Sequence, residues 1–125
     1  MSHFTTVAVQ INDIAALKAA CTEMGLEVLE HAEARGYGTN HTHGDYVIRL
    51  QGPYDAALLR QADGSFSVTA DLWDGHVERE LGKGFGKLKQ LYGVHKTTLE
   101  ARRKGLSVRR QPLAGGGIRL TLCRV

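Results

Sequence analysis

Two histidines at alternate positions are the residues of this sequence best suited to binding a metal ion. His41 and His43 are separated by one residue, and Asp45 follows two residues later. In an extended segment, side chains two residues apart point to the same side, so the two imidazoles could share a divalent ion. A solvated loop explains the same pattern and is the alternative. Because a zinc site needs three or four protein ligands, further ligands would have to come from His31, Cys21 or Cys123.

A glycine-rich stretch before the second helical region could bind an anion. Glycines that lead into a helix N-terminus can expose backbone N–H groups to a phosphate, and nearby lysines add positive charge. The stretch is not a Walker A motif, because its spacing is too short and Leu88 stands where Ser or Thr would hold magnesium. A mobile hinge or lid is the alternative. The candidate anion-binding residues are Gly82, Lys83, Gly84, Gly86 and Lys87.

Charge is distributed unevenly along the chain. Its 16 Lys and Arg residues against 13 Asp and Glu residues give a net charge of +3. Residues 1–80 contain 5 basic and 12 acidic side chains, a net charge of −7, whereas residues 81–125 contain 11 basic and 1 acidic, a net charge of +10. This division indicates either a binding surface or two parts of one fold that neutralise each other.

The basic portion supplies the candidate residues for binding a partner. Nucleic-acid surfaces usually combine basic with aromatic side chains, and only Phe85 and Tyr92 lie near the basic run. An acidic protein, or the acidic portion of a second copy, is therefore favoured over nucleic acid. His95 could act as a general base, but no nucleophile stands at a readable spacing, so a packing role is favoured. The candidate partner-binding residues are Trp73, Tyr92, His95, Lys96, Arg102, Arg103 and Lys104.

The pattern of apolar residues predicts one α+β domain over residues 1–125. Asn12 and Asp13 can cap a first helix that Gly25 ends, and Gly105 ends a second helix. Polar and glycine-rich residues 33–44 are expected to form a loop. The strands are predicted at 3–11, 26–30, 45–51, 54–61, 65–72, 106–111 and 118–125. We expect a two-layer sandwich in which two helices cover one face of a mostly antiparallel sheet.

A short internal similarity suggests a pseudo-repeat. Met24-Gly-Leu-Glu-Val follows the first predicted helix, and Lys104-Gly-Leu-Ser-Val follows the second. Each segment ends a helix at glycine and starts a strand with Leu-x-Val. The chain could therefore contain two β-α-β-β units.

Several classes of protein are disfavoured by composition. No apolar run approaches the ~20 residues that span a bilayer, and residues 1–6 lack the pattern of a secretory signal. We therefore expect a cytoplasmic protein without membrane contact. Cys21 and Cys123 are isolated from each other, and buried free thiols are expected. No catalytic constellation is assembled in the sequence, and no cofactor is predicted.

Six segments resemble the hypothetical chloroplast reading frame thirty-five family of cyanobacteria and algal plastids, a domain of unknown function with wider bacterial relatives. The matching segments are Met1-Ser-His-Phe, Met24-Gly, Ala34-Arg-Gly-Tyr-Gly, Ala70-Asp-Leu-Trp, Leu91-Tyr-Gly-Val-His-Lys and Ala101-Arg-Arg-Lys-Gly-Leu-Ser-Val, and Ile11 before the first helix matches as well. They run in order across nearly the whole chain. The sequence departs from the family at residues 82–86, at His41 and His43, and at a Gly-Gly-Gly turn. The resemblance supplies no reaction or substrate; relatives lie beside AAA+ ATPase genes, which implies an accessory role.

Three hypotheses follow from these observations. The first is a non-enzymatic accessory or adaptor protein that binds a larger protein machine, such as an AAA+ ATPase, through its charge-polarised surface. The second is a nucleotide- or nucleic-acid-binding module that uses the glycine-rich stretch and the basic helix. The third is a metal-dependent enzyme centred on His41 and His43. A homo-oligomer is compatible with each of them.

Overall fold

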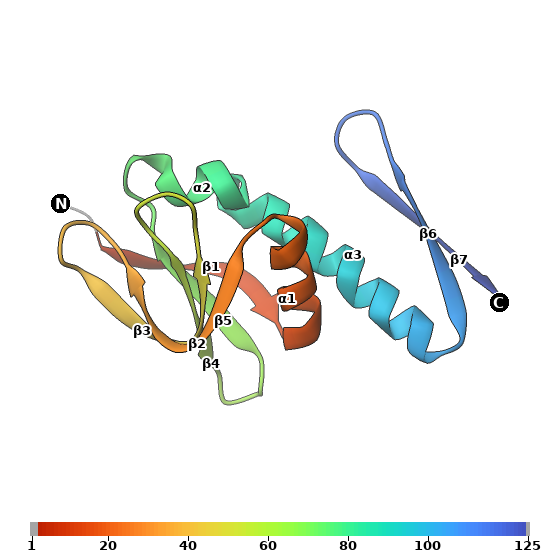
Figure 1. The fold of residues 1–125 in the computed structure, drawn as a ribbon, viewed down its shortest axis with the longest axis horizontal. Helices are drawn as coiled ribbons and strands as arrows, with labels where there is room; N and C mark the ends of the chain where they lie inside the picture. The colour runs from red at the N-terminus through yellow and green to blue at the C-terminus, as the bar shows by residue number, and fades with distance from the viewer. Residues whose placement is uncertain (1–2, 125) are drawn as a thin grey trace.

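The computed structural model describes residues 3–124 as an α+β fold (Figure 1). In chain order the elements are β1 (Phe4–Ile11), α1 (Ile14–Glu23), β2 (Glu27–Arg35), β3 (His41–Arg49), β4 (Ala56–Arg60), β5 (Phe66–Asp71), a short 3₁₀ turn η1 (Trp73–Gly75), α2 (His76–Leu81), a second turn η2 (Lys83–Phe85), α3 (Gly86–Arg103), β6 (Leu106–Pro112) and β7 (Ile118–Arg124).

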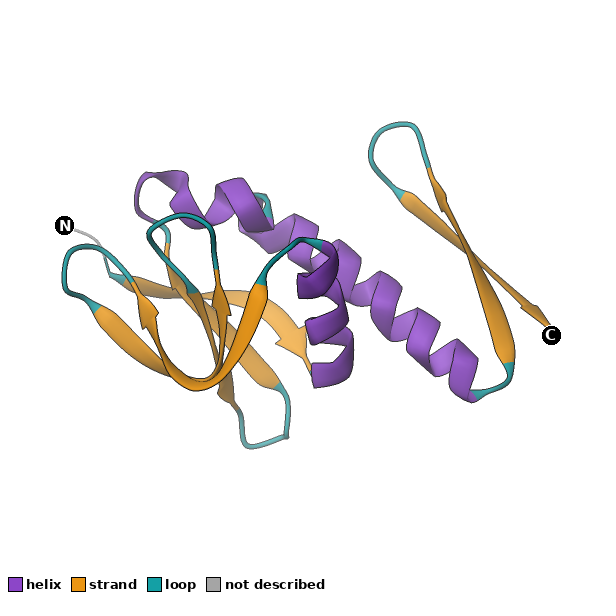
Figure 2. Cartoon of the chain, in the orientation of Figure 1, coloured by secondary structure: helices purple, strands orange, loops and turns teal. Residues whose placement is uncertain are grey.

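One antiparallel sheet, in the order β1-β5-β4-β3-β2, carries the core. The helices cover one of its faces (Figure 2), because α1 and α3 direct their apolar residues onto it. This main core includes Leu17, Cys21, Ile48, Leu58, Val68, Phe85 and Leu88. Ala34, Val47 and Ala57 form a second, smaller cluster. The predicted two-layer sandwich is confirmed.

The ends of both long helices follow the sequence signals. The side chain of Asp13 accepts a hydrogen bond of 3.0 Å from the backbone N–H of Ala16 and so caps α1. Gly25 and Gly105 follow α1 and α3 with φ of 73° and 77°, a conformation in which glycine has no side chain to clash.

The loop predicted for residues 33–44 is wrong for most of its length. β2 continues to Arg35 and β3 begins at His41, so only residues 36–40 form the turn. The segment looks like a loop because its exposed positions are polar and its buried positions are small. Ala34 is buried in the second cluster, and a Cβ on Gly44 would lie only 3.0 Å from Val47 Cγ2.

The second half of the pseudo-repeat does not extend the main sheet. β6 and β7 follow α3 as expected, but they pair only with each other and form a separate two-stranded sheet.

Cys123 on this hairpin is exposed, so the prediction of two buried thiols holds only for Cys21. Burial raises the pKa of the Cys21 thiol to about 12. None of the helices within residues 3–124 combines the length and apolar character that crossing a membrane requires.

Candidate functional site

The hairpin of β6 and β7 presents an apolar face that the chain leaves partly uncovered. It lies apart from the sheet, beside α3 (Figure 1). No described residue of either strand is buried. The register places Val108 opposite Leu122 and Arg110 opposite Leu120, so these four side chains share one face. Leu122 is 46% exposed.

A groove of about 180 Å³ separates this face from α3. It is lined by Val94, His95, Thr98, Arg102, Val108 and Arg110. The two valines offer apolar contact, and the two arginines offer positive charge and hydrogen-bond donors. The lining therefore suits a partner segment that carries both apolar and acidic side chains.

One carboxylate of α1 links the two elements that line the groove, α3 and β6. Glu23, the last residue of α1, accepts hydrogen bonds of 2.8 and 2.6 Å from Arg110 Nη1 and Nη2. His95 Nε2 lies 2.7 Å from Glu23 Oε1. The hydrogen bond from Arg110, followed by the contribution of His95, lowers the pKa of Glu23 to about 2 despite the opposing effect of burial. Arg110 and His95 thereby fix the hairpin against both helices.

Positive charge surrounds the groove. The hairpin from Leu106 to Arg124 contains four arginines and no acidic residue. Arg102 is exposed and has no ion-pair partner among the described residues. Arg103 Nη1 lies 4.0 Å from Asp13 Oδ2, while Lys104 is exposed at the end of α3 and Lys96 is half-buried. Of the predicted partner-binding residues, His95 and Arg102 line the groove itself.

Tyr92 lies inside the fold. Its side chain is buried, its hydroxyl donates to Asn12 Oδ1, and it accepts from the backbone N–H groups of Asn12 and Asp13, each at 3.0 Å. These bonds attach α3 to the start of α1, which gives Tyr92 a structural role.

Trp73 does not line the groove and lies in the turn η1 that precedes α2. It is 48% exposed, and its ring meets the 49% exposed Tyr37 edge to face, with the centroids 5.9 Å apart. The buried carboxylate of Asp71 accepts from the backbone N–H groups of both residues, at 2.9 and 3.0 Å. The sequence did not single out Tyr37, because the turn that brings it to Trp73 was predicted to be part of a longer loop.

The glycine-rich stretch forms the turn between α2 and α3. The backbone N–H of Gly84 donates to Glu78 Oε2 at 2.7 Å. This donor is therefore already hydrogen-bonded to a carboxylate of the chain itself. Lys83 and Lys87 are exposed, and Phe85, the residue before α3, is fully buried. The anion-binding role of Gly82, Lys83, Gly84, Gly86 and Lys87 stays a prediction.

Only one of the two histidines predicted to bind a metal, His43, belongs to a group of possible ligands within the described part of the chain. His43 joins His31 and Asp45 in one group, in which one ligand atom from each residue lies within 4.8 Å of the others. His41 lies at the start of β3, opposite Arg35, outside this group. His31, which the sequence offered only as a supplementary ligand, thus takes the place of His41, and Asp45 completes the cluster.

Sequence reasoning missed four residues that line the groove, Val94, Thr98, Val108 and Arg110, and it missed Glu23, which holds Arg110 beside the groove. The alternation of apolar residues in both hairpin strands was a usable signal for Val108 and Leu122. Glu23 gave none, because its partner Arg110 is 87 positions away.

The family model for Protein of unknown function (DUF1257) matches residues 20–121. Neither the curated proteins nor the solved structures contain a match to this chain. The matched segment covers most of the sequence, including the groove and all its lining residues. The chain therefore belongs to the DUF1257 family.

Proposed function

We propose that this protein is a non-enzymatic adaptor that binds an acidic segment of a larger protein machine in the groove between α3 and β6. The observation that carries the proposal is the β6–β7 hairpin. Its apolar face is partly exposed to solvent, with Leu122 46% exposed, and it carries four arginines and no acidic residue. An isolated two-stranded hairpin is marginally stable in water. A partner that covers Leu122 and neutralises the arginines would stabilise it by removing apolar surface from water.

The groove provides different contacts for two kinds of side chain. Val94 and Val108 can pack against an apolar residue of the partner. Arg102 has no ion-pair partner among the described residues and can form a bidentate pair with a carboxylate. Arg110 is already paired with Glu23. It therefore helps to shape the groove and adds positive potential there, but it does not form a new ion pair with the partner.

Three further proposals accompany the adaptor role. We propose that the chain belongs to the branch of DUF1257 formed by the hypothetical chloroplast reading frame thirty-five family, because its matching segments resemble that family. The implied neighbour of that branch, an AAA+ ATPase, is then the first partner to test. We also propose that the protein acts in the cytoplasm.

Affinity capture with charge-reversed variants tests the adaptor role. Wild-type protein, Arg102→Glu and Lys83→Glu are immobilised, and bound proteins from a lysate of the source cells are quantified by mass spectrometry. Arg102 lines the groove, whereas Lys83 carries the same charge change at the other end of α3. The acidic segment of any selectively captured protein is then synthesised, and its affinity for each variant is measured.

We expect a protein that wild type and Lys83→Glu retain and that Arg102→Glu loses. Its acidic peptide should bind Arg102→Glu about tenfold more weakly than wild type at low salt, because an attractive charge pair becomes a repulsive one. Loss with Lys83→Glu instead would place binding at the glycine-rich turn and contradict the proposal. Capture that depends on nucleic acid, capture of a second copy alone, or the absence of any groove-dependent partner would also contradict it.

A further inference from the structure

The bend shared by β2 and β3 gathers side chains that could ligate a metal. His31 has a φ of 46°, a left-handed conformation that costs most non-glycine residues about 1 kcal/mol. It interrupts the alternation of the strand, since Leu29 and Ala32 both pack against the second cluster although they are three residues apart. The pairs Glu30–Tyr46 and Ala32–Gly44 flank the bend, so His31 and Asp45 face each other across it.

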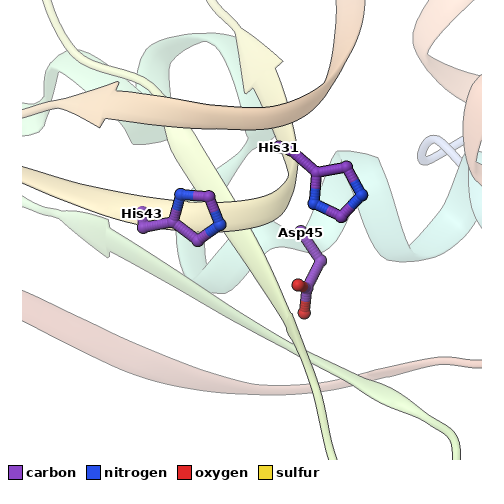
Figure 3. A group of neighbouring side chains, drawn as sticks. All are labelled: His31, His43 and Asp45. Atoms are coloured by element: carbon purple, nitrogen blue, oxygen red, sulfur yellow. The ribbon is translucent and has the colours of Figure 1, made fainter.

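The rings of His31 and His43 approach each other at this bend, with the side chain of Asp45 beside them (Figure 3). One ligand atom from each of His31, His43 and Asp45 lies within 4.8 Å of the others. The two imidazole rings are nearly parallel, 15° apart, with centroids separated by 6.3 Å. Ligands on a tetrahedral zinc with bonds of about 2.05 Å are about 3.3 Å apart. Small side-chain rotations would therefore close the group around an ion, and His31 and His43 are exposed enough to make them.

Neighbouring groups already orient two of the three ligands. His43 Nδ1 lies 3.2 Å from Glu33 Oε2; an Nδ1–H that donates to this carboxylate leaves Nε2 with a lone pair for a metal. Asp45 Oδ2 accepts from the backbone N–H of Arg60 at 2.8 Å, which leaves Oδ1 for coordination. A carboxylate behind a metal-ligating histidine is the usual support in protein metal sites.

We propose that His31, His43 and Asp45 bind a divalent transition-metal ion, for which zinc is the best match. The two imidazoles favour zinc over magnesium or calcium, which prefer oxygen ligands, and zinc also accepts a carboxylate as a third ligand. The charges of Asp45 and Glu33 offset that of the cation. Three protein ligands leave a fourth position for water or a bound group, as in open zinc sites. This site is on different elements from the groove and is independent of the adaptor role.

Titration of the metal-free protein with zinc alone, by calorimetry and by competition with a chromophoric chelator, tests the site. The variants are His43→Ala, Asp45→Asn and His31→Asn; asparagine tolerates the left-handed backbone at position 31. His41→Ala is the matched control, because it removes a histidine of the same strand that lies outside the group. Circular dichroism and thermal unfolding establish that each variant is folded.

Wild type and His41→Ala should bind one equivalent of zinc with the same affinity. His43→Ala should lose binding, and Asp45→Asn and His31→Asn should weaken it at least tenfold. Glu33→Gln should weaken it by about 10- to 100-fold, because its carboxylate orients His43. Substitution of cobalt should give a visible spectrum that His43→Ala removes. No binding to wild type, unchanged binding in the folded ligand variants, or an equal loss in His41→Ala would overturn the proposal.

Discussion

Arg110 on β6 holds Glu23 at the end of α1 through two hydrogen bonds of 2.8 and 2.6 Å between residues 87 positions apart. Both side chains are partly exposed, and the paired donors of the guanidinium match the two carboxylate oxygens. The bond attaches the hairpin to the sandwich at a point where the strands have no main-sheet neighbour. The position of the hairpin therefore depends on side chains more than on backbone pairing.

Removing this attachment should loosen the hairpin without unfolding the sheet. We expect Arg110→Ala to weaken the docking of β6 and β7 by about 1 kcal/mol, which corresponds to roughly fivefold faster amide exchange in these strands. Hydrogen exchange resolved by residue measures it. Arg109→Ala is the control, because Arg109 lies on the opposite face of the same strand. Equal acceleration in both variants, or faster exchange throughout β1–β5, would contradict the assignment.

The same ion pair predicts a dependence of stability on acid pH. The folded-state pKa of Glu23, about 2, lies below its ordinary value of 4.5. The stabilisation is therefore complete above about pH 5 and is lost as the pH falls from 4.5 toward 2. Thermal unfolding of wild type and Glu23→Gln across this range measures the difference. The gap in stability between the two proteins should shrink as the pH falls; a constant gap would show that Glu23 does not titrate this way.

Loss of the Tyr92 hydroxyl should destabilise the whole domain. Tyr92→Phe leaves the backbone N–H groups of Asn12 and Asp13 without their partner, and we expect a cost of about 1–3 kcal/mol. Urea unfolding gives the free energy of unfolding. Tyr37→Phe removes a hydroxyl from a residue that is 49% exposed and should change stability by less than about 0.5 kcal/mol. A Tyr92→Phe protein as stable as wild type would show that the hydroxyl of Tyr92 does not stabilise the fold.

Two glycine substitutions should have opposite effects. Gly82 has a φ of 84°, and a Cβ there would lie 2.6 Å from the backbone nitrogen of Lys87, so Gly82→Ala should cost about 2 kcal/mol or more. Gly93 lies inside α3, and the position that an added methyl group would take is open space. Gly93→Ala should therefore stabilise the protein by about 0.5–1 kcal/mol. Thermal unfolding of the two variants checks the signs, and a destabilised Gly93→Ala would contradict the account of α3.

Local signals in the sequence were enough to place most elements. Asp13, Gly25 and Gly105 mark helix ends through interactions within one turn, and the Gly-Gly-Gly segment marks the hairpin turn. The full length of β2 and β3 could not be predicted from the sequence. The residues there are small or polar, and the bend at His31 breaks the alternation that identifies a strand. The separation of β6–β7 from the main sheet was also unreadable, since alternation identifies a strand but not its neighbour.

The candidate site was predictable in its charge and less so in its geometry. Arg102 and His95 were found because charge and residue type are visible along the chain. The groove between them and Val108 depends on how the hairpin packs against α3, and Glu23 enters only through tertiary contact. In the metal cluster, His43 was identified from spacing, while His41 was replaced by His31 across the strand pair.

Photo-cross-linking in the source cells tests the adaptor role most directly. A photoreactive phenylalanine derivative is placed at position 122 or at position 121 of β7. Position 122 pairs with Val108 and shares its face of the hairpin, whereas position 121 pairs with Arg109 on the other face. The account predicts an adduct with one acidic protein from position 122, weak or absent from position 121, and lost when Arg102→Glu is added. Equal adducts from both positions, an adduct only with nucleic acid or a second copy, or no adduct from position 122 would contradict it.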